Sequence, residues 1–254
     1  MYSSAAKTVK DGEWLLDSII GFYFEYLSQT LNLEARKILL FQPSIAHLIA
    51  QASEIEYAKE ALPPEVNDMD YLFLPTNNGD SENVNGSHWS LLVYEKSNNI
   101  FRYYDSLKKA NLEPTRILVE RLCILFDCEK TNLIIEKSEQ QYNDSDCGVY
   151  LLLFAETLIK KLLESLEKSK KLIKINGLYD SHGSRSTKDA LFSIEKFNNS
   201  ENSPCSNFDK DLPDYSNNNA FDPSNENFWD LEELSYPPHL KRKEISLLIH
   251  QFSK

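Results

Sequence analysis

The sequence predicts an α+β fold in which helices pack against a small mixed or antiparallel sheet. Two long apolar stretches, at about residues 18–31 and 147–166, have the length and composition of buried helices. The strands predicted between them come mainly as an antiparallel pair, without the strand–helix–strand units that join parallel strands. With 254 residues, of which 41% are apolar, the chain is long enough for one sizeable core and an insertion.

The first long helix is apolar on almost every side, so we expect it to be deeply buried. Asp17 or Ser18 can cap its N-terminus, and it runs to about Leu31. Trp14 precedes the cap and can act as a hydrophobic staple, packing back onto the first turns of the helix.

The next part of the chain predicts short helices followed by a hairpin. Residues 35–62 have the pattern of short helices broken at Pro43, and residues 71–75 predict a short strand. Residues 88–94 and 100–105 predict two strands, which the turn-forming residues between them join into a hairpin.

The remaining predicted elements are mostly helical. Asn111 can cap a helix whose apolar residues recur at helical spacing, and a strand follows at 132–136. The second long helix begins at Cys147 and runs to about Leu166. Residues 240–252 predict a final amphipathic helix.

The composition changes between the last two helices. Residues 169–235 become rich in Asn, Ser, Asp and Pro and show no clear apolar period, which predicts a flexible low-complexity insertion in a single domain spanning residues 1–254. Five aromatic residues can attach this segment to the body, the interpretation that we favour, or contact a partner: Phe208, Tyr215, Phe221, Phe228 and Trp229.

Composition argues against several classes of function. The formal net charge of −12 argues against nucleic acid as a main ligand, because phosphate binding needs a basic surface. The sequence shows no apolar run near the ~20 residues of a membrane span and no signal-peptide core, so we expect no membrane association. Four cysteines without CxxC pairs or Cys/His clusters indicate a reducing compartment and no structural metal.

Three residues that are distant in sequence can form a catalytic group. Cys147 stands at the start of a helix, where backbone N–H groups favour a negatively charged sulfur, the nucleophilic form of cysteine. His88 begins one strand of the hairpin and Asp105 ends the other, so the two side chains can meet at one edge. Each residue alone is typical of ordinary packing or turns. Together they fill the roles of nucleophile, base and orienting acid once each, as a cysteine hydrolase requires.

Two further residues complete the predicted site. Gln141 lies six residues before Cys147, and its side-chain N–H₂ can stabilise an oxyanion together with the Cys147 backbone N–H. Gly148 lets substrate or backbone approach closely because it has no side chain.

These motifs resemble the ubiquitin-like-protein-specific cysteine proteases, the adenain-like group that includes the SUMO proteases and the deneddylases. The resemblance covers residues 14–165 and, weakly, 236–254, and it implies the papain-like fold of that family. Its strongest segments are Gly86-Ser87-His88-Trp89-Ser90-Leu91-Leu92-Val93, Tyr104-Asp105-Ser106, and Gln140-Gln141 through Asp146-Cys147-Gly148. Trp14-Leu15-x-Asp17 and residues 19–26 are similar to the deneddylase branch in particular.

The resemblance implies roles for individual residues. His88, Asp105 and Cys147 would be the catalytic triad and Gln141 the oxyanion residue. Trp14 and Trp89 would flank a channel for the Gly-Gly tail of the modifier, since a slot between two indoles admits only residues without a Cβ.

Asp17 would meet an arginine just before that Gly-Gly. The chain departs from the family pattern at Leu16, Tyr142 and Ser145, which bears on fine specificity.

The activity implied is cleavage after the C-terminal Gly-Gly of a Nedd-type (Rub) modifier and release from its conjugates, cullins among them. We expect a monomer in the cytoplasm or nucleus that needs no metal or organic cofactor. Three alternatives remain: a SUMO-specific protease, an acyltransferase with the same triad, and a non-catalytic module that binds the modifier. The two tryptophans favour a protease over a transferase, and the intact catalytic set argues against binding alone.

Overall fold

The computed structural model describes residues 5–79, 86–128, 132–179 and 222–252, with only the backbone for 172–179 and 226. The chain divides into two compact units, Met1–Lys160 with Trp229–Lys254, and Lys161–Phe228. Among the described residues, all the strands and the predicted catalytic residues belong to the first unit.

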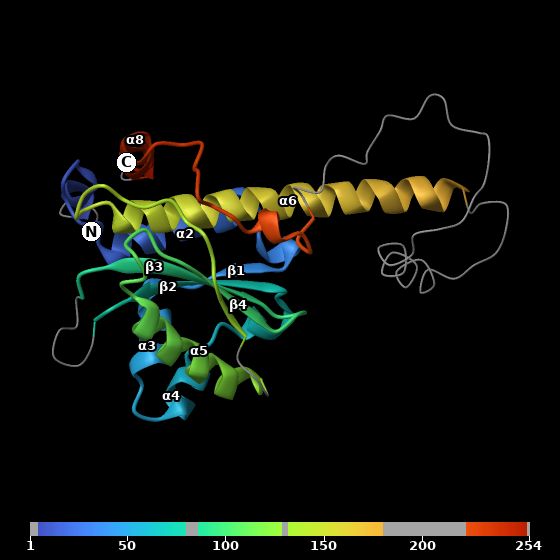
Figure 1. Cartoon of the computed structure of the whole chain (residues 1–254), viewed down its shortest axis with the longest axis horizontal. Helices are drawn as coiled ribbons and strands as arrows, with labels where there is room; N and C mark the ends of the chain where they lie inside the picture. Colours follow the sequence, from blue (N-terminus) through green and yellow to red (C-terminus); the bar gives the residue numbers. More distant parts are fainter. Residues whose placement is uncertain (1–4, 80–85, 129–131, 180–221, 253–254) are drawn as a thin grey trace. The chain divides into compact units, whose positions relative to one another are not determined.

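A five-stranded mixed sheet forms the centre of the first unit (Figure 1). The strands β2 (Tyr71–Asn77), β3 (Trp89–Glu95) and β4 (Ile100–Tyr104) pair antiparallel. Short strands β1 (Ile38–Leu40) and β5 (Leu133–Ile135) add parallel pairs at the two edges. The α+β class is confirmed.

The expectation that strand–helix–strand units are absent is wrong. The chain reaches β2 from β1, and β5 from β4, through intervening helices, and each connection joins parallel neighbours. The strand β5 corresponds to the one predicted at 132–136, whereas β1 lies in a stretch for which the sequence predicts short helices. With only three residues, fewer than the usual five or six, β1 carries too little apolar pattern to be recognised in the sequence.

Helices cover both faces of the sheet (Figure 1). On one face lie α2 (Asp17–Thr30) and the start of α6 (Cys147–Tyr179), and α8 (Pro238–Phe252) lies outside them. On the opposite face lie α3 (Pro43–Gln51), α4 (Ile55–Glu60) and α5 (Leu112–Phe126). Short 3-10 helices occur at Ala6–Val9 (η1), Glu34–Arg36 (η2), Pro64–Asp68 (η3) and Glu226–Phe228 (η6).

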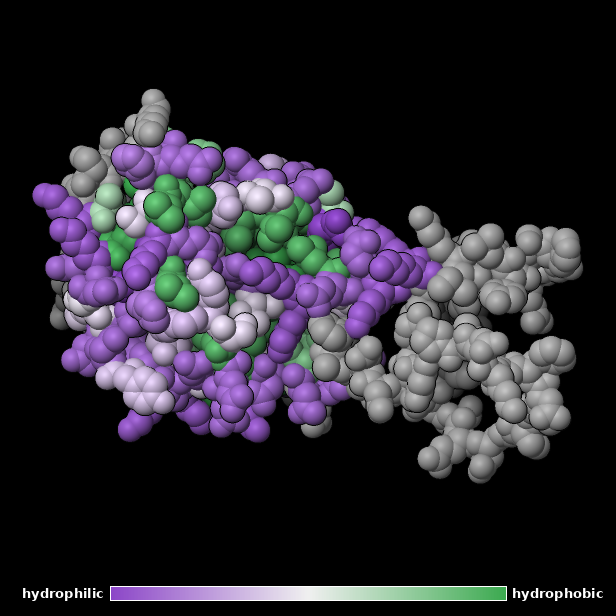
Figure 2. All heavy atoms as spheres, turned by 90° about the horizontal axis from the view of Figure 1, so that it is seen from above, coloured by the Kyte–Doolittle hydropathy of each residue, from purple (hydrophilic) through white to green (hydrophobic). Residues whose placement is uncertain are grey.

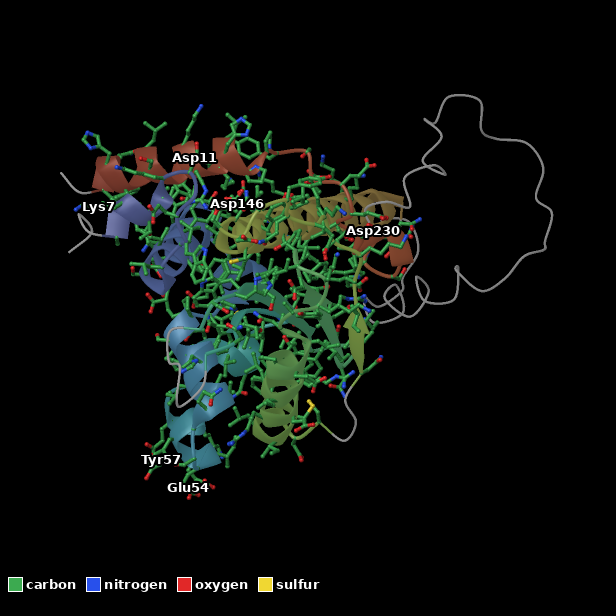
Figure 3. The ribbon with its side chains drawn as sticks, turned by 60° about the vertical axis from the view of Figure 1, so that its left-hand side comes forward. Lys7, Asp11, Glu54, Tyr57, Asp146 and Asp230 are labelled. Carbon is green, nitrogen blue, oxygen red and sulfur yellow. The ribbon has the colours of Figure 1, made fainter. Side chains whose placement is uncertain are left out.

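Seen from above, the surface is mainly hydrophilic, with hydrophobic areas set between hydrophilic residues (Figure 2). Within the described ranges, none of the helices combines the length and the apolar character that crossing a bilayer requires. Figure 3 labels one residue on each side of the sheet. Tyr57 belongs to α4 on one side, and Asp146, the residue before α6, lies on the other.

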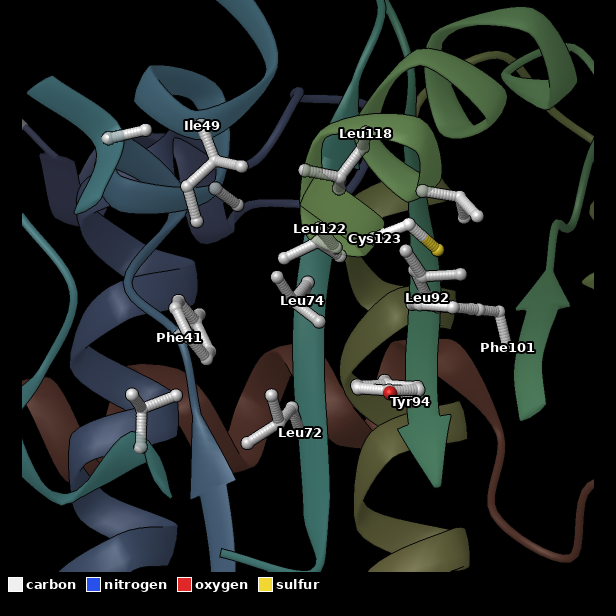
Figure 4. Close-up of a cluster of buried hydrophobic side chains, with 14 of the residues drawn as sticks. Phe41, Ile49, Leu72, Leu74, Leu92, Tyr94, Phe101, Leu118, Leu122 and Cys123 are labelled. Atoms are coloured by element: carbon white, nitrogen blue, oxygen red, sulfur yellow. The ribbon is translucent and has the colours of Figure 1, made fainter. Parts of the chain in front are cut away.

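The core on the α3 and α5 side is built from alternate residues of the central strands (Figure 4). Leu72 and Leu74 of β2 and Leu92 of β3 pack there with apolar residues of the helices. The intervening residues, such as Phe73 and Val93, are also fully buried, because successive side chains point to opposite faces and both faces are covered.

The predicted cap of α2 is wrong. The helix begins at Asp17, and the N-cap residue is Leu16. Leu16 has an extended backbone, and its apolar side chain makes no capping hydrogen bond. The Asp17 carboxylate accepts a hydrogen bond from Ser18 N (2.6 Å) in the first turn, where the helix dipole favours an acid. The burial of Leu15, directly before the cap, anchors the chain at this point.

The α6 helix continues to Tyr179, past the end expected near Leu166 and into the expected insertion at 169–235. The added turns, residues 167–179, contain four Lys, two Leu and one Glu, which favour helix, and Glu167 and Lys170 form an ion pair across one turn (3.9 Å). Residues 180–221, with Phe208, Tyr215 and Phe221, lie outside the described residues.

The chain rejoins the body earlier than expected. Trp229 is buried, and its ring lies 4.2 Å from the Arg102 guanidinium. Its carbonyl accepts a hydrogen bond from the Tyr104 hydroxyl (3.0 Å), and Leu231 N donates to Lys137 O (3.0 Å). Trp229 therefore attaches this end of the segment to the body.

Candidate active site

His88 and Asp105 meet at one end of the β3–β4 hairpin. The register pairs Leu91 of β3 with Tyr104 of β4, so the residues just outside these strand ends lie close together. His88 Nε2 is 2.6 Å from Asp105 Oδ1, and each residue is only 4% exposed. The structure thus brings together the histidine and the aspartate that the sequence nominates.

Asp105 is held by hydrogen bonds on both carboxylate oxygens. Oδ1 also accepts from Leu107 N (2.8 Å), while Oδ2 accepts from Asn111 N (3.0 Å) and from the Tyr103 hydroxyl. Burial tends to raise the pKa of Asp105, but the hydrogen bonds from His88 and Tyr103 and the charge of His88 lower it below its ordinary value. The carboxylate is therefore fixed in place and ionised.

The backbone around Asp105 is held as firmly as its side chain. The Asp105 carbonyl accepts hydrogen bonds from Ser138 Oγ and Gln140 Nε2, both at 2.9 Å. Gln140 Oε1 accepts from Lys108 N (2.8 Å), which ties the loop after the aspartate to the segment before the cysteine.

Asn111 is a site residue that sequence reasoning assigns differently. It occupies the N-cap position of α5, as expected, but its side chain makes no capping hydrogen bond. Instead its Nδ2 donates to His88 O (3.0 Å) and Thr76 O (3.1 Å), while its backbone N donates to Asp105. This fully buried residue therefore holds both His88 and Asp105, and nothing in its local sequence distinguishes it from a cap.

Cys147 is buried at the N-terminus of α6, close enough to His88 for its sulfur to contribute to the raised pKa of the imidazole. Because Nε2 of the imidazole faces Asp105, Nδ1 is the nitrogen left for the sulfur. Burial tends to lower the pKa of His88, but the hydrogen bond to Asp105 and the interactions with the Asp105 carboxylate and the Cys147 sulfur outweigh it and raise the pKa to about 9. The imidazole is thus protonated at neutral pH and can stabilise a negatively charged sulfur.

A pocket of about 440 Å³ opens beside Cys147. Trp14, Asp17 and Trp89 line it, as the resemblance implies for a tail channel. Trp14 is 50% exposed and lines this pocket, and because the N-cap of α2 is Leu16, the staple position before the cap belongs to Leu15. Further lining comes from α3, which sequence reasoning did not connect with the site: Pro43, Ser44 and His47.

The sequence predicts that Gly148 lets substrate or another part of the chain approach closely, and the structure shows a close approach by the chain at Leu15. A Cβ on this residue would lie 2.9 Å from Leu15 Cβ, closer than two carbon atoms can pack. Gly148 is buried and absent from the pocket lining, whereas Leu15 lines the pocket. The glycine therefore lets the segment that carries Trp14 lie directly against the start of α6.

Gln141 has an ordered side chain in the loop before Cys147. Its Oε1 accepts from Ser106 Oγ (2.7 Å) and its Nε2 donates to Asn143 O (2.6 Å). An amide N–H₂ carries two protons, so a second donor remains for an oxyanion, and the N-terminus of α6 supplies the Cys147 N–H. The arrangement can carry out nucleophilic cleavage of an acyl bond.

Comparison with known proteins agrees with this chemistry. Residues 13–176 match the model of the Ulp1 protease family, C-terminal catalytic domain. The probable sentrin-specific protease 8 of Dictyostelium discoideum is 34% identical over 185 residues, covering 67% of this chain and 76% of that protein.

NEDD8-specific protease 2 of Schizosaccharomyces pombe is 32% identical over 161 residues; the match covers 61% of this chain but only 39% of that protein. A crystal structure described as the de-sumoylating protease aligns with a TM-score of 0.52 over 98% of this chain and 86% of its own, at 14% identity, which supports the fold alone. The family model covers more than half of the sequence and includes His88, Asp105, Gln141 and Cys147. The chain therefore belongs to the Ulp1 protease family and is a cysteine protease.

Proposed function

We propose that this protease cleaves after the C-terminal Gly-Gly of a ubiquitin-like modifier of the NEDD8 type. The observation that carries the proposal is the single pocket that both tryptophans, Trp14 and Trp89, line together with Asp17 and Cys147. A tail without side chains fits between two indoles, and an arginine before it can pair with Asp17. The similarity to a relative named NEDD8-specific protease 2 favours the NEDD8-type modifier.

The proposed reaction uses each residue of the site once. The Cys147 sulfur attacks the carbonyl of the terminal glycine, while Gln141 and the Cys147 N–H hold the oxyanion. His88 donates its proton to the departing amine and then takes one from the water that hydrolyses the acyl-enzyme. Asp105 keeps the imidazole in the required orientation.

The proposal extends to conjugates in which the departing amine belongs to a lysine, cullins among them. Among the described residues, Cys123, Cys128 and Cys147 are free thiols, which supports action in a reducing compartment, the cytoplasm or the nucleus. We also propose that the enzyme works as a monomer, which a mass measurement in solution tests.

A parallel cleavage assay tests the modifier assignment. The intact chain is incubated with NEDD8, SUMO and ubiquitin, each carrying a fluorogenic amide at its C-terminus, and kcat/KM is compared, with Cys147→Ser as the inactive control. We expect the highest kcat/KM for NEDD8. A preference for SUMO would overturn the choice of modifier, and cleavage of none, together with transfer of acetyl groups to protein, would favour the acyltransferase.

A further inference from the structure

Two basic residues of the amphipathic helix α8 are buried, although charged residues usually lie on the exposed face of such a helix. Lys241 and Arg242 are 2% and 3% exposed, while Leu247 on the same helix is 71% exposed. Lysine and arginine are rarely buried unless they are paired, so the partners of each show what its burial achieves.

Arg242 makes hydrogen bonds to two segments that form the active site. From the loop before the nucleophile, Asp146 Oδ1 accepts from Nε (2.9 Å) and Nη2 (2.7 Å), and Ser145 O accepts from Nη2 (3.0 Å). From the N-terminal segment, three carbonyls accept hydrogen bonds from the same guanidinium: Thr8 O (3.3 Å), Lys10 O (2.9 Å) and Glu13 O (2.8 Å).

Both segments lead directly into the site. Asp146 precedes Cys147, and its carbonyl accepts a hydrogen bond from Tyr150 N (2.9 Å) in the first turn of α6. Glu13 precedes Trp14, the exposed wall of the pocket. Figure 3 labels Asp146 and, in the N-terminal segment, Lys7 and Asp11. A single guanidinium therefore spans the residues adjacent to the nucleophile and to the wall.

The hydrogen bonds continue from Asp146 to the oxyanion residue. Asn143 Nδ2 donates to Asp146 Oδ2 (2.8 Å), and Asn143 Oδ1 accepts from Asp146 N (3.0 Å). The Asn143 carbonyl in turn accepts from Gln141 Nε2 (2.6 Å). Arg242 thus lies at one end of a chain of contacts whose other end is the side chain that would hold the oxyanion.

We propose that Arg242 is a positioning residue that fixes the nucleophile loop (residues 141–146) relative to the Trp14 wall of the tail pocket. It touches no reacting atom and acts through Asp146 on Cys147 and through Glu13 on Trp14. The inference rests on the proposed function for the tail that occupies the pocket. Arginine suits the role because its planar fork can donate in several fixed directions, which a lysine ammonium cannot reproduce.

Lys241 provides a matched control within the same helix. It is equally buried, but its ammonium binds the Tyr23 hydroxyl (2.9 Å), Glu156 and Glu244 (2.8 Å), all outside the nucleophile loop and the N-terminal segment. Replacing either residue by methionine removes a buried cation, so both variants should lose thermal stability. Only the arginine variant should disturb the geometry of the site.

The test measures kcat and KM for the NEDD8 amide in the full chain carrying Arg242→Met, Arg242→Lys or Lys241→Met. We expect kcat/KM to fall about tenfold to a hundredfold for Arg242→Met, because small displacements of reacting groups cost that much. Arg242→Lys, the variant more certain to fold, should show a smaller loss. Lys241→Met should keep the wild-type kcat/KM at temperatures where it is folded.

Double variants separate positioning from general destabilisation. Arg242 is hydrogen-bonded to the segment that carries Trp14 but not to Trp89 or its strand. Arg242→Met should therefore lower kcat/KM by a smaller factor in a Trp14→Ala background than in the wild type. In a Trp89→Ala background the two losses should multiply. The role of Arg242 would be overturned if Arg242→Met and Lys241→Met lost kcat/KM equally. It would also be overturned if the loss from Arg242→Met simply multiplied with the loss from the tryptophan variant in both backgrounds.

A wild-type chain that cleaves none of the modifiers would instead overturn the proposed function. Alkylation of Cys147 by iodoacetamide then serves as a readout that needs no modifier, and it should still be slower in Arg242→Met than in Lys241→Met. Equal alkylation rates in those two variants would end the inference.

Discussion

His88 Nε2 lies 2.6 Å from Asp105 Oδ1, and the same carboxylate accepts hydrogen bonds from Leu107 N and Asn111 N. Because Nε2 is committed to Asp105, the proton available for the leaving amine is the one on the sulfur-facing nitrogen. The pair therefore determines how the imidazole is oriented as well as its charge.

Replacement of Asp105 by asparagine should lower kcat roughly a thousandfold or more with KM little changed, because the amide cannot accept hydrogen bonds on both sides and so favours the wrong histidine tautomer. Stopped-flow cleavage of the NEDD8 amide measures the loss. Asp68→Asn, at an exposed position of η3, is the control and should match the wild type. A loss below tenfold would show that another group orients His88.

Activity and stability should both decline at alkaline pH because the pKa of His88 is raised from its ordinary 6.5 to about 9. A raised pKa means that the folded state holds the proton more tightly than the unfolded state does. The stabilisation is therefore complete below pH 6.5 and is lost as the pH rises through about 9. The same deprotonation removes the acid for the leaving amine, so kcat/KM should fall above pH 9.

Urea unfolding at several pH values, together with a pH profile of kcat/KM, checks both effects. Asp105→Asn should shift the alkaline limb of the profile to lower pH, since it removes one cause of the raised pKa of His88. His239→Gln, at an exposed position of α8, should leave the alkaline decline unchanged. An alkaline limb that stays in place in Asp105→Asn would contradict the assignment.

Local sequence explains why the triad could be predicted and its supports could not. His88, Asp105 and Cys147 stand at the ends of elements that can be recognised from a short window, and a hairpin brings two of these ends together. Tyr103 and Asn111 look like a core aromatic and a helix cap, and their roles depend on contacts that only the folded chain creates. In the sequence, Arg242 looks like a surface residue. Helical periodicity shows which residues lie on the same face of α8 as Arg242, but it does not show which groups of the folded chain pack against that face.

Replacement of Tyr103 by phenylalanine should destabilise the fold by about 1.5–3 kcal/mol, the usual range for a hydrogen bond to a charged group. The hydroxyl donates to Asp105 and accepts from Asn111 N (3.1 Å), so kcat should also fall several-fold. Urea denaturation and steady-state kinetics measure the two effects. Tyr94→Phe is the matched control: its hydroxyl binds the Asn99 amide oxygen and the Cys128 sulfur and no carboxylate, so stability should drop by about 1 kcal/mol and activity should persist.

Replacement of Trp14 by alanine should raise KM for the NEDD8 amide with little change in Tm, because half of the indole is already exposed in the free protein. A loss of about 2 kcal/mol, roughly 30-fold in kcat/KM, is typical of a tryptophan that anchors a partner. The variant should also cleave a modifier ending in Ala-Gly relatively better than the wild type does, since a wider slot no longer rejects a Cβ. Tyr57→Ala, 59% exposed on α4, removes a comparably accessible aromatic that does not line the pocket and lies across the sheet from Asp146 (Figure 3), and it should change neither quantity. If Trp14→Ala lowers kcat/KM but keeps the wild-type discrimination against Ala-Gly, the tail does not pass between the two indoles.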